Sequence, residues 1–349
     1  MSFNQYTWDL YKQTTIGIEM IKYFSDAGGY VLFKDYCPYA NFIPEDLYND
    51  WLENIYCYGV SDYDHPSSLE EAKDLYISLI TLGIRVEGQQ WLPANDFKNM
   101  LGIIQPMSYV LSQFAPEYFF PYLFLCRIFE LNKIADFFNI DLPNIPKRTD
   151  YKGRCMYYWE LCEVFYLFRK ENGLSPADLW SFLYDFAPNN LPSEKIDMPK
   201  PSQVWFIGGR LYQEDKSLES KFWQSSPETK KGDILVHYET SPISAITCIE
   251  ISLTDGVIDP LFRYYGCIYI GNRINIPHIT LKELQTDEYF FKHPLVRKNF
   301  QGVNGWSVNS ENYSELLRMI KTKGFDIEVL PKLYAPTLPK DVIIEYEHC

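Results

Sequence analysis

Apolar residues recur at two different spacings along this chain, and the spacing changes near residue 200. In the first part they recur every three or four positions, as in 69–80 and 151–172. Residues at this spacing share one face of a helix, so the pattern predicts amphipathic helices. Gly173 is placed to end the second of these helices, and Ser175 followed by Pro176 is a typical start for the next.

Beyond residue 202 apolar and polar residues alternate, which predicts half-buried β-strands. Strands are expected over 203–207, 233–238, 245–253 and 263–274, followed by a short strand over 306–308 and a late one over 341–347. Thr280 with Glu283 forms a capping-box pattern, and Ser310 is placed to start a further helix. The stretch between the two patterns is rich in proline and lacks apolar periodicity. The sequence therefore predicts an α+β fold with a helical domain over 1–192, a linker over 193–202 and a β-domain over 203–349.

Composition narrows the partners that this chain can have. Hydrophobic residues make up 46% of the sequence, enough for a packed core, and the net charge is −14. Residues 1–200 hold 16 Lys+Arg and 27 Asp+Glu, whereas 201–349 hold 16 and 19. Such a balance argues against a protein that coats nucleic acid by charge alone. Any contact with nucleic acid is therefore expected to be local and to involve the second part.

Cysteine and histidine spacing predicts neither a metal site nor a cofactor. The eight cysteines include no C-x-x-C pair, and His237, His278 and His293 lack the spacing of metal ligands. We expect buried, reduced thiols. No run of about 18 apolar residues occurs, and the first residues lack a basic region ahead of an apolar stretch. We therefore expect a cytoplasmic protein that makes no contact with a membrane.

Several short motifs follow residue 202 in a fixed order. They are Val204-Trp205-Phe206, Phe222-Trp223, Gly232-Asp233 with Tyr238, and the stretches 276–284, 299–305 and 311–320. This series resembles the EVE branch of the PUA-like superfamily. The resemblance implies a small β-barrel over about 203–324, with Phe222 and Trp223 on a helix after the first strand. One departure is Glu239-Thr240, because the family often has a serine near the end of the second strand.

Proteins of this family typically hold a modified or flipped nucleobase in an aromatic-lined pocket, often beside modules that restrict foreign DNA. Reading an unstacked base requires a π face and directional hydrogen bonds. The candidate base-binding residues are Trp205, Trp223, His237, Tyr238, Thr240, Ser241, Asn304 and Trp306. The candidate phosphate-binding residues are Arg210, Lys221, Lys230, Lys231, Arg263 and Arg273. For each aromatic residue the competing interpretation is plain core packing, and for each cation a solvated surface charge.

The first hypothesis is therefore a module for anti-phage defence that binds DNA with a modified base and works with an effector protein. The second is an enzyme that excises or cuts at that base. The helical part, over 120–124, 134–143 and 157–169, resembles the segment found beside such readers in modification-dependent restriction proteins. Asp185, at a helix end among apolar residues, is the candidate catalytic carboxylate. The competing role for Asp185 is a structural hydrogen-bonding group. The third hypothesis is a protein-interaction role without nucleic acid.

Overall fold

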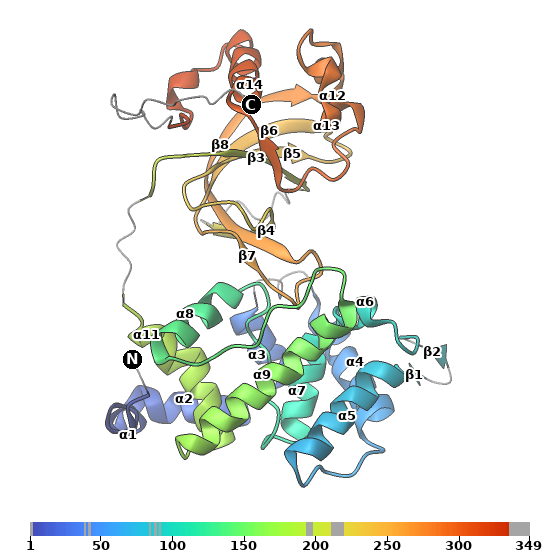
Figure 1. Cartoon of the computed structure of the whole chain (residues 1–349), viewed down its shortest axis with the longest axis vertical. Helices are drawn as coiled ribbons and strands as arrows, with labels where there is room; N and C mark the ends of the chain where they lie inside the picture. The colour runs from blue at the N-terminus through green and yellow to red at the C-terminus, as the bar shows by residue number, and fades with distance from the viewer. Residues whose placement is uncertain are drawn as a thin grey trace, which may run out of the picture. The chain divides into compact units, whose positions relative to one another are not determined.

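A computed structural model describes residues 3–37, 40, 43–83, 85–86, 89–90, 92–192, 198–210 and 220–334. Contacts divide the chain into two compact units. Unit 1 comprises Met1–Lys195 and Val257–Tyr265, and unit 2 comprises Ile196–Gly256 and Gly266–Cys349. The chain is thus a mixed α+β protein, helical in its first part and sheet-bearing in its second (Figure 1).

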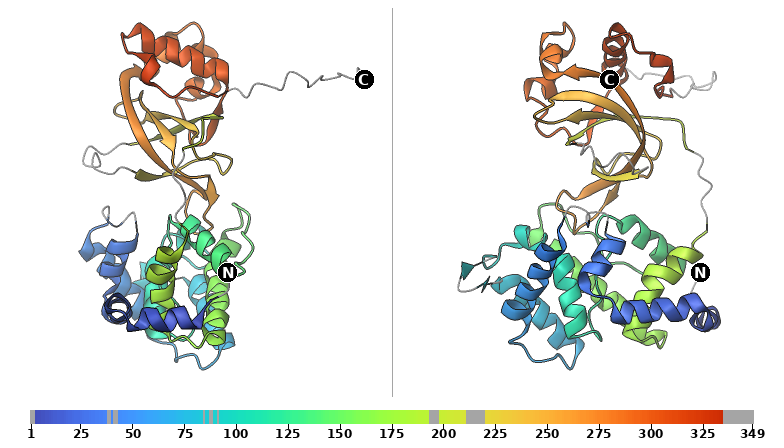
Figure 2. Two further views of the ribbon diagram at one scale, coloured as in Figure 1. Left: turned by 90° about the vertical axis from the view of Figure 1, so that its left-hand side faces the viewer. Right: turned by 180° about the vertical axis from the view of Figure 1, so that it is seen from behind.

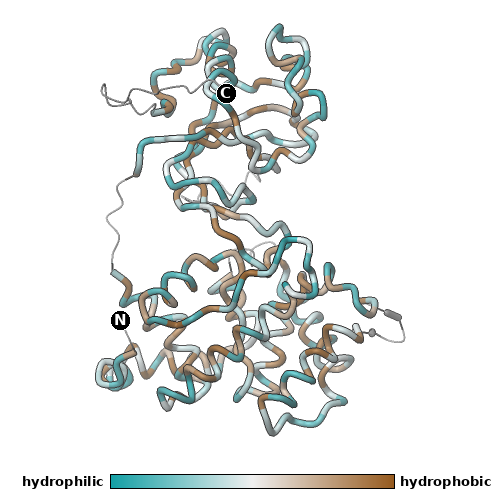
Figure 3. The backbone as a smooth tube through the Cα atoms, in the orientation of Figure 1, coloured by the Kyte–Doolittle hydropathy of each residue, from teal (hydrophilic) through white to brown (hydrophobic). Residues whose placement is uncertain are grey.

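Unit 1 is built from helices around one aromatic-rich core. The helices are α1 (Gln5–Gln13), α2 (Thr15–Asp26), α3 (Gly29–Tyr36), α4 (Glu45–Ile55), α5 (Leu69–Leu82), α6 (Phe97–Met100), α7 (Ile104–Phe114), α8 (Ile128–Phe138), α9 (Tyr151–Glu171), α10 (Pro176–Ser181) and α11 (Ala187–Asn190). Two π-helical stretches, Tyr56–Val60 and Phe182–Phe186, and a short hairpin of β1 (Arg85–Val86) and β2 (Gln89–Gln90) complete it. Hydrophobic and hydrophilic segments alternate along these helices (Figure 3).

The helical periodicity of the sequence placed two of the helices of unit 1 correctly. Helices α5 and α9 confirm the two that were expected over 69–80 and 151–172. The glycine after α9, Gly173, has a φ of 63°, a left-handed conformation that glycine adopts without strain. Helix α10 begins with the expected capping box, in which Ser175 and Asp178 bond each other's backbone N–H groups.

The segment 257–265 packs with the helices of unit 1, although it lies within the stretch that the sequence analysis assigned to the β-domain. Leu261 is buried in the helical core. The carboxylate of Asp259 is fully buried and accepts bonds from the backbone N–H groups of Cys126 (3.1 Å), Leu261 (2.9 Å) and Phe262 (3.1 Å). These bonds satisfy a buried charge and fix the shape of the segment.

Unit 2 is a curled sheet with helices on one face (Figures 1 and 2). Its strands are β3 (Val204–Gly209), β4 (Ser220–Gln224), β5 (Ile234–Glu239), β6 (Ala245–Ser252), β8 (Gly266–Thr280) and β9 (Trp306–Val308), in the order β4-β8-β6-β5-β3-β9. Strands β3 and β5 are parallel, and the other neighbours are antiparallel. The helices are α12 (Leu281–Thr286), α13 (Pro294–Arg297) and α14 (Ser310–Thr322).

One expectation for this part of the chain is wrong. Phe222 and Trp223 do not lie on a helix but in strand β4, where they face Tyr269 and Ile268 of β8. A short apolar run fits a helix and a strand equally well, and here pairing with the long strand β8 decides between them. The expected capping box of Thr280 and Glu283 is confirmed at the start of α12. The late strand expected over 341–347 lies outside the described residues.

The two faces of the sheet carry different side chains. Val204 and Phe206 belong to a cluster with Leu316 and Ile320 of α14, so this face is covered by helices. Trp205 points to the other side, as the alternation along a strand requires. There it packs in a small cluster that we call the Trp205 face, defined by Trp205, Ile207, Leu235, Ile268 and Ile270, with Trp223 packed against it.

Candidate functional site

Strand register brings a group of polar side chains to the Trp205 face. Trp205 of β3 is in register with Leu235 of β5, and Leu235 is in register with Glu250 of β6. Two pairs further along, His237 faces Cys248. Residues opposite one another on neighbouring strands share a face, so these polar groups lie on the same face of the sheet as Trp205. The side chains of His237, Cys248 and Glu250 are all buried.

Glu250 connects a cation on one side to an imidazole on the other. Its Oε1 accepts a bond from Nε of Arg273 at 2.8 Å, and its Oε2 lies 3.0 Å from Nδ1 of His237. Burial by itself would raise the pKa of the Glu250 carboxyl. The hydrogen bond from His237, together with the hydrogen bond and charge of Arg273, outweighs burial and holds that pKa below its ordinary value. The charge of Arg273 is therefore matched by a buried carboxylate.

The other ring nitrogen of His237 has no partner. Nε2 is buried and makes no hydrogen bond within the part of the chain that the structure describes. The indole of Trp223 lies against the imidazole, with ring centroids 4.7 Å apart and planes at 63°. Trp223 is itself only partly buried, and it packs so closely on Gly209 that a Cβ there would lie 2.5 Å from Cζ2 of the indole. Seven other buried side-chain atoms of the described residues also lack a partner, so this feature alone does not mark a site. The partly exposed ring of Trp223 beside the imidazole distinguishes His237 and makes this place the candidate binding site.

Trp205 has a different role from Trp223. Its ring is 5% exposed, and its Nε1 donates to Oδ2 of Asp233 at 2.9 Å. Asp233 also accepts from the backbone N–H groups of Lys230 (2.9 Å) and Gln203 (3.1 Å), and from the hydroxyl of Ser202. The Asp233 side chain thus bonds residues at the start of β3 and β5 and holds the indole of Trp205 in place on the Trp205 face.

Two candidate aromatic residues point away from this group. Tyr238 lies in the helix-covered cluster and stacks on Phe300, with centroids 4.0 Å apart and planes within 3°. Trp306 packs against the same cluster and is in register with Phe206 across β3 and β9. The structure therefore brings Trp205, Trp223 and His237 together, and it does not bring Tyr238 or Trp306 to them.

The candidate hydrogen-bonding residues near the strand ends take part in contacts within the protein, several of them through the backbone. Asn304 accepts from the N–H of Gly208 at 2.7 Å and donates to the side-chain oxygen of Gln224 at 3.3 Å. Ser241 offers its carbonyl oxygen to Nε of Arg210 at 3.1 Å, and Thr240 lies just beyond the end of β5. Asn304 thus supports the backbone next to Gly209, on which Trp223 packs.

The candidate phosphate-binding cations are dispersed. Arg210 and Lys230 are exposed, Lys231 is half-buried, and the side chain of Lys221 lies outside the described residues. Arg263 is exposed on the segment 257–265 of unit 1, because β8 begins at Gly266 and not at residue 263. Among those candidate cations whose side chains the structure describes, Arg273 is the one that joins the polar group of the Trp205 face.

Asp185 in unit 1 has partners for both carboxylate oxygens. Oδ2 accepts from the hydroxyl of Tyr11 at 2.6 Å, and Oδ1 accepts from Nδ2 of Asn189 at 3.0 Å. Burial and the bond to Asp185 raise the pKa of the Tyr11 hydroxyl well above its ordinary value, so the hydroxyl stays a donor. These contacts are those of a structural hydrogen-bonding group.

Sequence reasoning missed Cys248 and Glu250. Their ligand atoms and those of His237 all lie within 4.8 Å of one another, the kind of grouping that can hold a metal ion. Burial raises the pKa of the Cys248 thiol to about 12, so the sulfur is protonated at neutral pH. The only signal in the sequence was an acidic residue in an otherwise apolar strand, at 250, which on its own predicts no partner.

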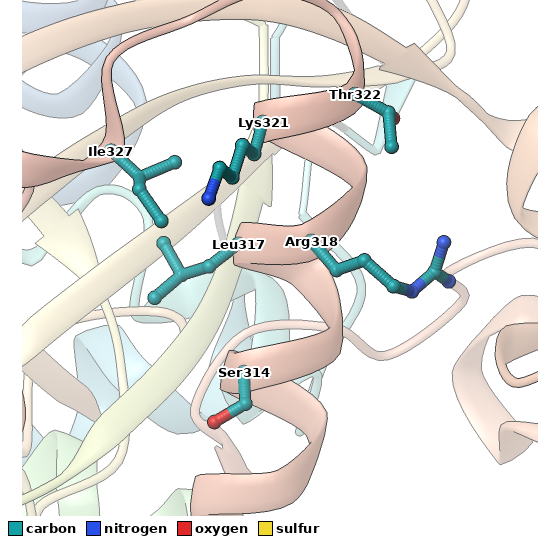
Figure 4. Close-up of a pocket in the computed structure, with 6 residues that line it drawn as sticks. All are labelled: Ser314, Leu317, Arg318, Lys321, Thr322 and Ile327. Carbon is teal, nitrogen blue, oxygen red and sulfur yellow. The ribbon is translucent and has the colours of Figure 1, made fainter.

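A groove on helix α14 lies apart from this group. It is lined by Ser314, Leu317, Arg318, Lys321, Thr322 and Ile327 (Figure 4). Arg318 turns its guanidinium to Asp287 and Glu315, each at 2.6 Å. Because two carboxylates match its charge, Arg318 does not make this groove a site for anions.

Helices suited to crossing a bilayer, both long and apolar, do not occur among the described residues. Comparison with protein-family models and with curated proteins found no match. Among solved structures, the NMR structure of Rpa0253 from Rhodopseudomonas palustris is 13% identical, with a TM-score of 0.30, covering 34% of this chain and 94% of that one. A hypothetical protein from Leishmania major is 11% identical, with a TM-score of 0.29, covering 36% of this chain and 98% of that one. TM-scores this low assign no fold.

Proposed function

We propose that the Trp205 face of unit 2 binds a modified or flipped nucleobase in nucleic acid, with DNA as the first candidate. The observation that carries the proposal is the buried Nε2 of His237, which makes no hydrogen bond among the described residues and belongs to a ring packed against the partly exposed indole of Trp223. An unstacked base needs an aromatic face and directional polar groups. Trp223 would supply the aromatic face, and His237 with Arg273 the polar groups.

We propose further that the curled sheet is a PUA-like barrel of the EVE kind, acting in bacterial anti-phage defence with an effector protein. Support comes from the ordered motifs of the sequence and from the role of one of them. The Gly232-Asp233 turn holds the indole nitrogen of Trp205, so two motifs of the resemblance meet in space. The near-balanced charge of 201–349 fits local binding of a base better than broad binding of a duplex.

The test is a titration of labelled oligonucleotides with and without modified cytosines, using the full chain. Trp223→Ala is expected to weaken binding about tenfold to a hundredfold, because one base–aromatic stack contributes about 1–3 kcal/mol. Trp306→Ala is the matched control, since it removes an equally large ring from the other face of the sheet. Negligible binding to every oligonucleotide, together with co-purification of a stable protein partner, would replace this proposal with a protein-interaction role.

A further inference from the structure

The contacts of His237 fix which of its two ring nitrogens carries a proton. Nδ1 lies 3.0 Å from Oε2 of Glu250, whose other oxygen accepts from Arg273. An ionised carboxylate has no proton to give, so the hydrogen of this bond must belong to Nδ1. In the neutral imidazole Nε2 then carries a lone pair and is an acceptor. Nε2 itself is buried and receives no hydrogen bond from the residues that the structure describes.

His293 in the same unit shows the opposite arrangement and so provides an internal reference. Its Nδ1 accepts the backbone N–H of Leu295 at 3.3 Å, as a cap at the start of α13. The proton of the neutral ring must therefore be on Nε2. Burial lowers the pKa of His293, which favours the neutral ring. Two buried histidines of one unit are thus expected in opposite tautomers.

We infer that His237 is a specificity-determining acceptor, and that the ligand is a nucleobase presenting an unsubstituted N–H, such as an exocyclic amino group, to Nε2. This inference rests on the proposed function. A buried acceptor without a partner destabilises any complex that does not supply a donor. A site built around such an atom discriminates strongly against an analogue that lacks the matching group. Glu250 and Arg273 are positioning residues, which act by holding the tautomer of His237.

A metal ion is the competing ligand for this nitrogen, and the contacts disfavour it. A carboxylate that accepts from Nδ1 of a histidine often supports a metal on Nε2. Here both oxygens of Glu250 are occupied, by Arg273 and by His237, so the carboxylate is not free to coordinate. The remaining groups are Nε2 of His237 and Sγ of Cys248. Two ligands fall short of the three or four that a zinc site uses.

Access to Nε2 requires Trp223 to move. His237 is fully buried, and the indole of Trp223 lies against its ring. Trp223 is partly exposed, so its ring can turn toward solvent. A flat heterocycle that entered between the turned indole and the imidazole would stack on Trp223 and bring its edge near Nε2.

The first experiment measures the tautomers directly in the full chain. Histidine labelled with ¹⁵N is followed by long-range ¹H–¹⁵N NMR at mildly alkaline pH, with the five histidines assigned from single substitutions. We expect the proton of His237 on Nδ1 and that of His293 on Nε2. A proton on Nε2 of His237, or on both of its nitrogens, overturns the inference. The tautomers are read in the unaltered protein, and the substitutions serve only to assign the resonances.

The second experiment compares oligonucleotides that differ only in the number of N–H groups on the exocyclic amino group of one base. The probes carry cytosine or adenine whose amino group is free, singly methylated or doubly methylated. Loss of the last N–H is expected to weaken binding about tenfold to a hundredfold, and removal of only one N–H to weaken it much less. His237→Gln, whose amide can turn either end to the ligand, is expected to reduce this discrimination.

The outcomes separate the inference from the function on which it rests. Binding of bases that is equally strong with and without an N–H overturns the acceptor role and leaves base binding intact. Binding of no base at all overturns the proposed function and with it the ligand class, whatever the tautomer of His237. Titration with Zn²⁺ alone tests the competing ligand. A stoichiometric shift of the Nε2 resonance of His237 that is abolished in Cys248→Ser would assign the site to a metal ion and overturn the inference.

Discussion

Nη2 of Arg154, on helix α9, lies 2.6 Å from the carbonyl oxygen of Phe262, 108 positions later in the chain. The same guanidinium donates from Nε to the carbonyl of Pro260 at 2.8 Å and from Nη1 to that of Arg148 at 3.0 Å. Arg154 is 1% exposed. These bonds replace the hydration of a buried charge by backbone acceptors, and they tie the segment 257–265 to the helices of unit 1.

Replacing Arg154 by methionine is therefore expected to destabilise unit 1. Methionine keeps much of the side-chain volume but leaves the carbonyls of Pro260 and Phe262 buried without donors. Bonds to a charged donor contribute about 1.5–3 kcal/mol each, so we expect a loss of about 3 kcal/mol or more in the free energy of unfolding. Urea unfolding followed by circular dichroism measures it. Arg148→Met is the control, because that side chain is exposed, and a loss of equal size there would contradict the argument.

A fragment of residues 1–195 is expected to bind a synthetic peptide of residues 257–265. The fragment lacks Leu261, which is buried in the helical core, and Asp259, which caps the backbone N–H of Cys126. Without these two side chains, the fragment exposes the apolar surface that Leu261 covers and loses the acceptor of the Cys126 N–H. Added peptide should raise the melting temperature of the fragment in a concentration-dependent manner. A peptide with Leu261→Asp is the control, and equal stabilisation by both peptides would mean that the segment is not part of this core.

The stability of unit 1 is expected to depend on the protonation of Asp259. Burial raises the pKa of its carboxyl to about 6, against the lowering effect of the backbone N–H bonds from Cys126, Leu261 and Phe262. The folded protein then keeps a proton at pH values where the unfolded chain has lost it. Stability should therefore fall as the pH rises from about 4 to about 6, by about 2–3 kcal/mol, and change little above that from this group.

Unfolding free energies measured across this pH range test the dependence. Asp259→Asn cannot titrate, and although it lowers stability overall, it should remove this part of the slope. The ionic strength is held constant so that the other charges are screened equally in both proteins. A slope that persists unchanged in Asp259→Asn would assign the titration to another group.

Local signals in the sequence account for much of the fold. The helical spacing of 151–172 and the capping box of Ser175 and Asp178 were sufficient to place α9 and α10, because both depend on residues within a few positions of one another. Alternation likewise predicted that Trp205 and Val204 point to opposite faces of their strand.

Features that depend on distant pairing could not be predicted in this way. The apolar pair Phe222 and Trp223 becomes a strand only because β8 supplies its partners. Likewise, the meeting of His237 with Glu250 follows from the register of β5 and β6, which includes a shift after His237 that no sequence motif marks. The candidate base-binding set mixed both sheet faces. Alternation separates Tyr238 from its neighbour His237, but it does not say which of the two faces Trp223.

The last prediction concerns the close contact between the indole of Trp223 and Gly209. A Cβ on residue 209 would lie 2.5 Å from Cζ2 of the indole, closer than atoms in contact allow, so Gly209→Ala must displace the ring from His237. We expect a loss of about 1–3 kcal/mol in the free energy of unfolding, typical of overpacking, and altered affinity for any base that stacks there. Gly59→Ala is the matched control, because its Cβ would meet Leu79 at an ordinary 3.5 Å.

A double-mutant cycle shows whether the indole causes the effect. In a Trp223→Ala background the space beside residue 209 is empty, so Gly209→Ala should cost little or nothing there. The φ of Gly209 lies outside the left-handed region, so alanine adds no backbone strain in either background. An equal loss of stability with and without the indole would show that Gly209 is required for another reason, and the ring of Trp223 would then not depend on this contact for its position over His237.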